Sequence, residues 1–132
     1  MKTYQHKVHY YETDKMGIVH HSNYIRWMEE ARIDYFSQKG WEFEKLEALG
    51  IVSPVTAVDC KYRVSTRFAD VIDISVKLEE FRGVKMKLSY EMRRGEELVC
   101  EGYSEHGFLD SEGKIISLKR SFPEVYKALI QD

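Results

Sequence analysis

The sequence contains little proline, glycine and cysteine. Its 132 residues include two prolines, eight glycines and two cysteines. No stretch is rich enough in proline, glycine or serine to form a linker or a repeat unit, so residues 1–132 are predicted to form one domain. Two cysteines are too few for a disulfide framework. This favours a reducing compartment, and a cytoplasmic location is the default expectation.

The sequence also lacks long apolar runs and a strong net charge. No run approaches the roughly 20 apolar residues that span a bilayer, and the charged start 1–7 is not followed by the apolar segment of a signal peptide. Twenty Lys and Arg against 22 Asp and Glu leave a net charge of −2, which provides no global field for a polyanion. We therefore expect neither a membrane span nor a nucleic-acid partner.

One segment near the start has the spacing of a helix. Between Ser22 and about Lys39 apolar residues recur every three or four positions, and Gly40 supplies a stop. Further apolar residues fill the other sides, so the helix is apolar almost all round and is predicted to be enclosed. The spaced residues are Tyr24, Met28, Ala31 and Tyr35, and the others are Ile25, Trp27, Ile33 and Phe36.

The second half of the chain alternates between apolar and polar residues, which is typical of strands with one solvated face. Short glycine-bearing breaks separate the runs and are suited to hairpins. Three runs alternate and a fourth is longer and mixed: 58–64, 72–78, 86–92 and about 98–109.

Weaker signals complete the predicted fold. We expect a first strand near 5–11, a short strand near 114–118, a C-terminal helix after Ser121, and a short helix with a solvated face over 42–47. The prediction is an α+β fold in which a curved antiparallel sheet wraps around one long central helix. Open sheet edges in so small a domain favour pairing with a second copy.

Polar chemistry is concentrated between Tyr10 and Tyr24. This loop contains two carboxylates, Glu12 and Asp14, and it leads into the predicted helix, whose first backbone N–H groups lack intrahelical partners. Such donors and the helix dipole can polarise a substrate carbonyl, while a carboxylate attacks it or activates water. This layout suits acyl transfer.

The sequence of this loop resembles the motif of a known family, the 4-hydroxybenzoyl-CoA thioesterases, whose members have the hotdog fold. The resemblance continues through 68–71 and 81–82 to Phe122 and Pro123, and so covers nearly the whole chain. It is strongest to the acyl-CoA thioesterase branch associated with the bacterial Tol-Pal system, which also has a histidine at the position of His21. The matching residues are Asp14-Lys15-Met16-Gly17-Ile18-Val19, His21, Asn23-Tyr24 and Arg26-Trp27-Met28-Glu29.

The resemblance implies roles for individual residues. Asp14 corresponds to the catalytic carboxylate, which acts as a nucleophile in some members and as a general base in others. The backbone N–H at His21 corresponds to the donor that polarises the carbonyl, and whether the His21 side chain takes part stays open. The substrate-binding residues that it implies are Gly17, Ile18, Val19, Tyr24 and Arg82.

Arg82 matches a basic position that contacts the CoA nucleotide in some relatives. Where those relatives continue with further basic residues, this chain has Gly83 and Val84. The predicted function is hydrolysis of an acyl-CoA to a free acid and CoA, with water as second substrate, no cofactor and no metal, by a homodimer or homotetramer. The alternatives are a non-catalytic acyl-CoA-binding or scaffold protein and a hotdog dehydratase, which needs a histidine and acid pair.

Other chemistry-bearing residues favour plainer interpretations. Glu12 is expected to be a solvated loop carboxylate. A metal site at the histidines is not expected, because adjacent histidines point apart and no Cys or carboxylate lies at a recognised ligand spacing. Cys60 and Cys100 lie in strand runs and are expected to act as small buried apolar residues rather than nucleophiles.

Overall fold

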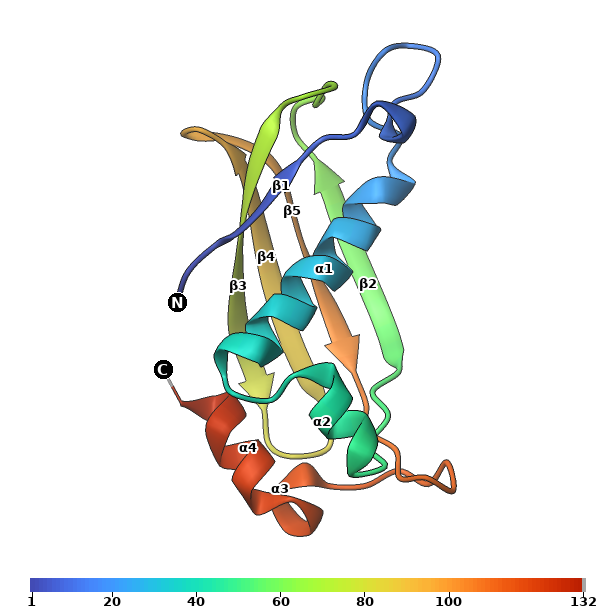
Figure 1. The fold of residues 1–132 in the computed structure, drawn as a ribbon, viewed down its shortest axis with the longest axis vertical. Helices are drawn as coiled ribbons and strands as arrows, with labels where there is room; N and C mark the ends of the chain where they lie inside the picture. Colours follow the sequence, from blue (N-terminus) through green and yellow to red (C-terminus); the bar gives the residue numbers. More distant parts are fainter. Residues whose placement is uncertain (132) are drawn as a thin grey trace.

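An antiparallel sheet of five strands, in the order β1-β3-β4-β5-β2, forms the centre of the computed structural model, which describes residues 1–131 (Figure 1). Strands β3, β4 and β5 follow one another as hairpins, while β1 pairs with β3 and β2 pairs with β5 at the two open edges. The strands are β1 Tyr4–Lys7, β2 Val55–Tyr62, β3 Val71–Phe81, β4 Met86–Arg94 and β5 Glu97–His106.

One long helix, α1 (Ser22–Gln38), crosses one face of this sheet diagonally (Figure 1). The loop before α1, with a short 3₁₀ helix at Tyr10–Glu12, lies at one end of the sheet, and the shorter helices gather at the other. Those shorter helices are α2 Phe43–Ala48, α3 Leu118–Ser121 and α4 Pro123–Ile130.

The core lies between α1 and the inward face of the sheet. Trp27 and Met28 on α1 are fully buried, and so are alternate residues of the strands, which face the helix because side chains alternate along a strand. Burying each such side chain contributes about 1.5–3 kcal/mol. The strand residues with no exposed surface include Ile72, Ile74, Met86, Leu88 and Met92.

Periodicity correctly predicted α1, α2, α4 and the four strands β2 to β5 to within a few residues. Two strand predictions were wrong. The first strand ends at Lys7 rather than near Tyr11, because the chain turns there into the 3₁₀ helix. Residues 114–118 make only an isolated bridge between Leu109 and Ile115 instead of a strand.

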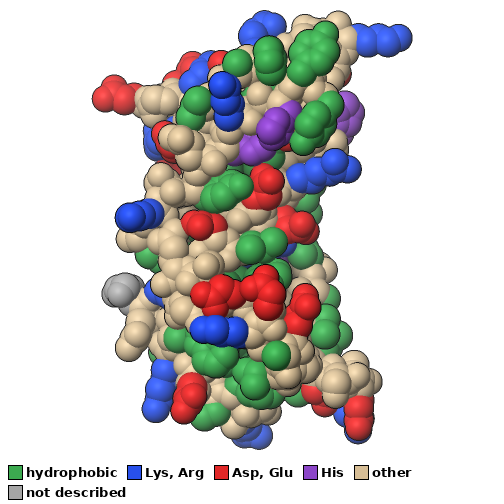
Figure 2. Space-filling model, in the orientation of Figure 1, with side chains coloured by type: hydrophobic (Ala, Val, Ile, Leu, Met, Phe, Trp, Pro, Cys, Tyr) green, Lys and Arg blue, Asp and Glu red, His purple; other side chains and the backbone are tan. Residues whose placement is uncertain are grey.

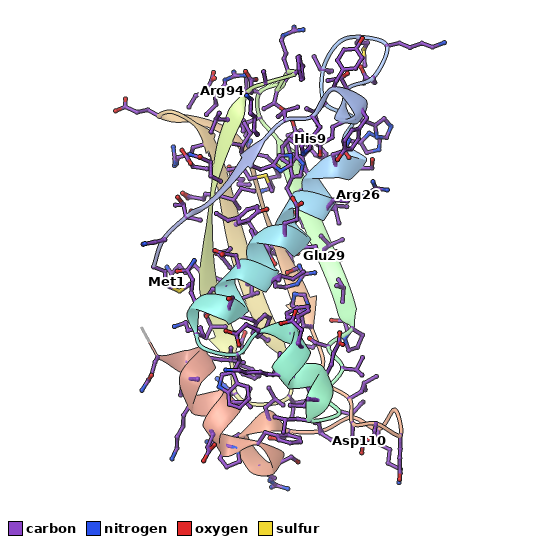
Figure 3. The ribbon with its side chains drawn as sticks, in the orientation of Figure 1. Met1, His9, Arg26, Glu29, Arg94 and Asp110 are labelled. Carbon is purple, nitrogen blue, oxygen red and sulfur yellow. The ribbon has the colours of Figure 1, made fainter. Side chains whose placement is uncertain are left out.

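The prediction that α1 is enclosed was also wrong for the single chain. One side of α1 is open, with Ile25 44% and Ile33 38% exposed. Arg26 and Glu29 lie on this outward side (Figure 3). Charged side chains are scattered over the same face of the molecule, and histidines gather near the start of α1 (Figure 2). The sheet covers α1 on one side only.

Candidate active site

The loop that carries Asp14 is a tight turn tied to the body of the protein. Gly17 N–H donates to the Asp14 carbonyl at 3.0 Å, and Asp14 N–H donates to the Ile18 carbonyl at 2.8 Å. Gly17 has φ +78°, a left-handed conformation that glycine adopts without strain. Val19 N–H then donates to the Thr66 carbonyl at 2.8 Å, which anchors the loop beside the start of β3.

The Asp14 carboxylate is half-buried and has one oxygen available. Its Oδ1 accepts a hydrogen bond from the Met16 backbone N–H at 2.8 Å. Within residues 1–131, no hydrogen bond reaches the other oxygen, Oδ2. The turn therefore holds the side chain in place and leaves an oxygen free to attack an electrophile or to take a proton from water.

His21, the residue before α1, supplies a backbone donor and lines the same cavity as Asp14. Ser22 N–H donates to His20 Nδ1 and Asn23 N–H donates to the His20 carbonyl, at 3.2 and 3.0 Å. The N–H of His21 donates no hydrogen bond to any residue that the structure describes. A free N–H at a helix N-terminus attracts negative charge, so it can stabilise an oxyanion.

Asp14 and His21 line the same cavity, which has a volume of about 280 Å³. Three of the residues predicted to bind substrate, Ile18, Val19 and Tyr24, line it with them, whereas Gly17 supports the loop from outside. Sequence reasoning missed the other wall. It comes from Met16 and from the end of β2 and the residues after it: Tyr62, Arg63, Val64 and Ser65.

Two tyrosines form the aromatic wall of the cavity. The ring centroids of Tyr24 and Tyr62 lie 5.2 Å apart. Burial raises the pKa of Tyr24, whose hydroxyl shares a 2.7 Å hydrogen bond with Thr66 Oγ1. Burial and the nearby Cys60 raise the pKa of Tyr62 to about 12. Both phenols are neutral at pH 7, so neither tyrosine supplies a negative charge to the cavity.

Glu12 is not the solvated loop carboxylate that the sequence suggested. Its side chain is buried, and both of its oxygens accept hydrogen bonds. Oε1 accepts from His6 Nε2 and from the His9 N–H, both at 2.8 Å, and Oε2 accepts from Trp27 Nε1 at 2.7 Å. Burial alone raises the pKa of Glu12, but these hydrogen bonds outweigh it and the net pKa is lowered. Glu12 is a structural anion at the base of the loop.

The histidines also differ from expectation. His20 and His21 stack with ring centroids 4.2 Å apart instead of pointing apart. His6, His9 and Glu12 bring three atoms of ligand type within 4.8 Å of one another, although no familiar ligand spacing predicted it. Both oxygens of Glu12 already accept hydrogen bonds there, so the contacts describe a hydrogen-bonded cluster rather than a vacant ligand set.

Arg82 lies far from Asp14 within one chain. Asp14 is at the end of the sheet where β3 begins, and Arg82 follows the last residue of that 11-residue strand. At about 3.3 Å per residue, the strand separates the two by about 33 Å. Arg82 instead borders a cavity of about 210 Å³ with Lys85 and Lys87.

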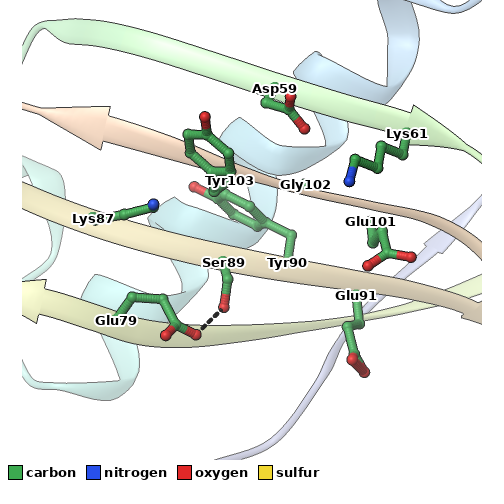
Figure 4. A pocket seen from close by; sticks show the side chains of 10 residues that line it. All are labelled: Asp59, Lys61, Glu79, Lys87, Ser89, Tyr90, Glu91, Glu101, Gly102 and Tyr103. Atoms are coloured by element: carbon green, nitrogen blue, oxygen red, sulfur yellow. Dashed lines mark hydrogen bonds between the residues drawn. The ribbon is translucent and has the colours of Figure 1, made fainter.

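The outer face of the sheet holds a larger hollow of about 600 Å³ (Figure 4). Charges of both signs line it, including Lys61 and Glu91, and Ser89 Oγ donates to Glu79 at 2.7 Å. A surface of interspersed charges remains hydrated and does not suit an apolar acyl group. The cavity at Asp14 is thus the better candidate for chemistry on such a group.

With this fold and site, the chain belongs to the thioesterase-like superfamily, whose model matches residues 8–130. The predicted family, hotdog fold and enzyme class, a thioester hydrolase, are confirmed. None of the helices formed by residues 1–131 has the length and apolar character to cross a membrane.

Particular relatives are similar over almost their full lengths. An Aquifex aeolicus protein with the provisional name of esterase is 33% identical over 124 residues, 94% of this chain and 96% of its own. An acyl-CoA thioesterase from Helicobacter pylori is 25% identical, covering 94% of this chain and 96% of its own. The structure of a DHNA-CoA thioesterase from Staphylococcus aureus has a TM-score of 0.92 and 32% identity, covering 96% of this chain and 87% of its own.

Proposed function

We propose that this protein hydrolyses an acyl-CoA thioester to a free acid and CoA at the cavity between Asp14 and His21. The observation that carries the proposal is the meeting of a carboxylate oxygen and a backbone N–H, both without hydrogen-bond partners in the described chain, at one cavity. The names of the relatives, acyl-CoA thioesterase and DHNA-CoA thioesterase, support a CoA thioester as the bond that is broken.

The chemistry follows from these two groups. The thioester carbonyl oxygen accepts a hydrogen bond from the His21 N–H, and the dipole of α1 stabilises the negative charge that develops on it. In the nucleophilic route, Asp14 attacks, CoA leaves as a thiolate, and water hydrolyses the mixed anhydride. In the general-base route, Asp14 takes a proton from water, which attacks directly. Both routes consume one water and release one acid and one CoA.

The decisive variant is Asp14→Asn, which removes the charge and keeps the shape. We expect thiol release to fall by at least about 10³-fold, as is typical when a catalytic carboxylate is lost, with folding and ligand binding retained. The measurement is free-thiol release from short, long and aromatic acyl-CoA substrates. Glu112→Gln, an exposed carboxylate on a distant turn, is the matched control.

The other outcomes of this assay have definite meanings. Full turnover by the Asp14→Asn variant would exclude the proposed mechanism. Unsaturated acyl-CoA formed without free thiol would identify a dehydratase. Saturable acyl-CoA binding without turnover, across all chain lengths, would identify a binding or scaffold protein.

The same proposal includes a homodimer that completes the site. The edge strand β2 is exposed at Val55, Val58 and Tyr62, and its free backbone groups can pair with another strand. Antiparallel pairing with the same strand of a second copy reverses the partner's sheet. The partner's turn after β3, with its Arg82, then comes to the end where this chain's Asp14 lies.

Mixed dimers test this arrangement. If each site takes Asp14 from one chain and Arg82 from the other, a dimer of one Asp14→Asn chain and one Arg82→Ala chain has one intact site. We expect the mixture, after subunit exchange, to exceed the summed activity of the two variants. Activity equal to that sum, or a fully active monomer at micromolar concentration by light scattering, would refute the shared site.

A further inference from the structure

Thr66 is a buried residue of the turn between β2 and β3, which lies at the same end of the sheet as the loop before α1 (Figure 1). Its carbonyl accepts a hydrogen bond from the Val19 N–H at 2.8 Å, and its hydroxyl shares a 2.7 Å hydrogen bond with the hydroxyl of Tyr24. Val19 belongs to the loop that carries Asp14, and Tyr24 belongs to α1. Thr66 therefore connects the two segments that supply the reactive groups of the candidate active site.

The hydrogen bond to Val19 determines where the Asp14 loop lies. Thr13 and Val19 face each other in an isolated antiparallel bridge, and the Asp14 N–H donates to the Ile18 carbonyl at 2.8 Å. The loop is thus a small closed hairpin, whose returning side is bound to the Thr66 carbonyl. A shift of Thr66 would move the hairpin and the Asp14 carboxylate with it.

The hydrogen bond to Tyr24 determines where the start of α1 lies. The Tyr24 N–H donates to the His21 carbonyl at 3.3 Å, so the two residues are directly linked. The Tyr24 ring is 3% exposed and lies 4.7 Å from the ring of Trp27, between centroids. Its hydroxyl and that of Thr66 are both buried and satisfy each other, which fixes both side chains.

The turn that contains Thr66 is itself held firmly. Arg94 Nη1 donates to Asp70 Oδ2 at 2.7 Å and to the Ser65 carbonyl at 3.3 Å, and so joins the two ends of the turn. Ala69 has φ +71°, a left-handed conformation that residues other than glycine seldom adopt. Such a conformation persists only where the surrounding contacts impose it, which is common near active sites.

We propose that Thr66 is a positioning residue that holds the Asp14 carboxylate at a fixed distance from the His21 N–H. This inference rests on the proposed function, in which those two groups act on one thioester. Thr66 does not line the cavity that they share, so it acts through Val19 and Tyr24 and not by contact with the substrate. Catalysis depends on such placement, because reacting groups must be held close to their productive geometry.

The variant Thr66→Val removes the hydroxyl and keeps the backbone carbonyl and the shape of the side chain. We expect kcat to fall by roughly 10- to 100-fold with KM within about threefold of wild type, because a displacement of about 1 Å can have this effect. Thr66→Ser, which keeps the hydroxyl, should recover most of the lost kcat. Thr3→Val, at an exposed threonine before β1, is the matched control. A lower thermal midpoint with unchanged kcat would show a purely structural role and overturn the inference.

A double-mutant cycle tests the route through Tyr24. Tyr24→Phe breaks the same hydrogen bond from the other side. The double variant of Thr66→Val and Tyr24→Phe should therefore lose no more kcat than the more affected single variant. Losses that multiply would show that Thr66 acts independently of Tyr24, and would overturn the inference. Circular dichroism confirms the fold of each variant.

Amide hydrogen exchange tests the positioning role without turnover. In Thr66→Val, the N–H groups of Asp14 and Val19 should exchange about 10-fold faster than in wild type, as expected when one hydrogen bond that holds the loop is lost. The Asp110 N–H is the control, because it donates to the carbonyl four residues later, as the Asp14 N–H does. Asp110 lies at the opposite end of the molecule, so its exchange should not change (Figure 3).

The two readouts distinguish this inference from the proposed function. Asp14-dependent hydrolysis that Thr66→Val leaves unchanged overturns the inference and leaves the proposed function intact. Faster exchange at Asp14 in a variant of a protein that hydrolyses no acyl-CoA supports the hold of Thr66 on the loop and refutes the proposed function. Unchanged exchange at Asp14 and Val19 overturns the inference whether or not thioesters are hydrolysed.

Discussion

Two carboxylates, two residues apart in one loop, have opposite environments. Glu12 is 5% exposed and both its oxygens accept hydrogen bonds, from His6, His9 and Trp27. Asp14 is half-buried, and its Oδ2 has no partner in the described chain. The comparison shows a division of labour, in which one anion is committed to structure and the other is left free to react.

The backbone extends this contrast. The Glu12 carbonyl accepts hydrogen bonds from the His20 N–H and from Asn23 Nδ2, both at 2.9 Å, so Glu12 ties the loop to the start of α1. Asp14 and His21 both lie on the segment between Glu12 and Asn23 that these hydrogen bonds hold. Fixing one carboxylate therefore positions the other relative to the free N–H of His21.

The matched variants Glu12→Gln and Asp14→Asn test this division most strongly. Glu12→Gln should lower the free energy of unfolding by about 3–5 kcal/mol, because a buried anion is lost and its buried donors lose acceptors. Asp14→Asn should change the same free energy by less than about 1 kcal/mol. Urea unfolding followed by tryptophan fluorescence measures both. Similar losses for the two variants would contradict the division of labour.

Two substitutions at His21, on the other side of the site, distinguish the role of its backbone N–H from the role of its side chain. His21→Pro removes the N–H, and proline tolerates the observed φ of −56°. It should lower kcat by about 10²–10³-fold, the usual effect of losing an oxyanion donor. His21→Ala keeps the N–H and should cost less than about 10-fold.

These two variants need a check of folding, which circular dichroism and the urea midpoint provide. His20→Ala serves as the control for loss of the ring stack between the two histidines. Near-total loss of turnover in His21→Ala with an intact fold would show that the imidazole takes part in the chemistry. That result would contradict the role in oxyanion stabilisation that we assign to the backbone N–H of His21.

The sequence predicted the parts of this comparison that depend on local pattern. Alternation and helical spacing identify α1 and four strands, because burial against one face imposes a period. The motif identifies Asp14 and His21, which line one cavity. Burial of Glu12 was not predictable, because it depends on Trp27, fifteen residues away, and on His6 from a strand that ends earlier than its pattern indicates.

Arg32 and Tyr62 were missed for related reasons. Arg32 is one of five charged residues in α1, and its residue type gives no signal that it faces inward. Tyr62 is on the inward side of an alternating run, and that signal could have placed it on the wall of the cavity. Arg82 has a motif match, but a single chain puts it at the far end of β3, and only an assembly could bring it to the site.

The smallest predicted effect is a change in the stability of the protein with pH. The folded state keeps His106 neutral with a pKa of about 4, below its reference value of 6.5, between Arg32 of α1 and the hydroxyls on β4 and β5. Because the unfolded chain takes up this proton first, the contribution is complete above about pH 6.5 and is lost as the pH falls toward 4. The loss is at most about 3 kcal/mol.

The lowered pKa of Glu12 acts in the same direction at lower pH, since its contribution is present above the reference value of 4.5 and is lost below it. Urea unfolding from pH 8 to pH 3 should therefore show stability falling first through the His106 range. His106→Gln should flatten the curve between about pH 6.5 and 4, and Asp14→Asn should leave it unchanged. A curve that His106→Gln does not alter would show that the pKa of His106 is the same in the folded and the unfolded state, which would contradict the lowering of this pKa by burial and by Arg32.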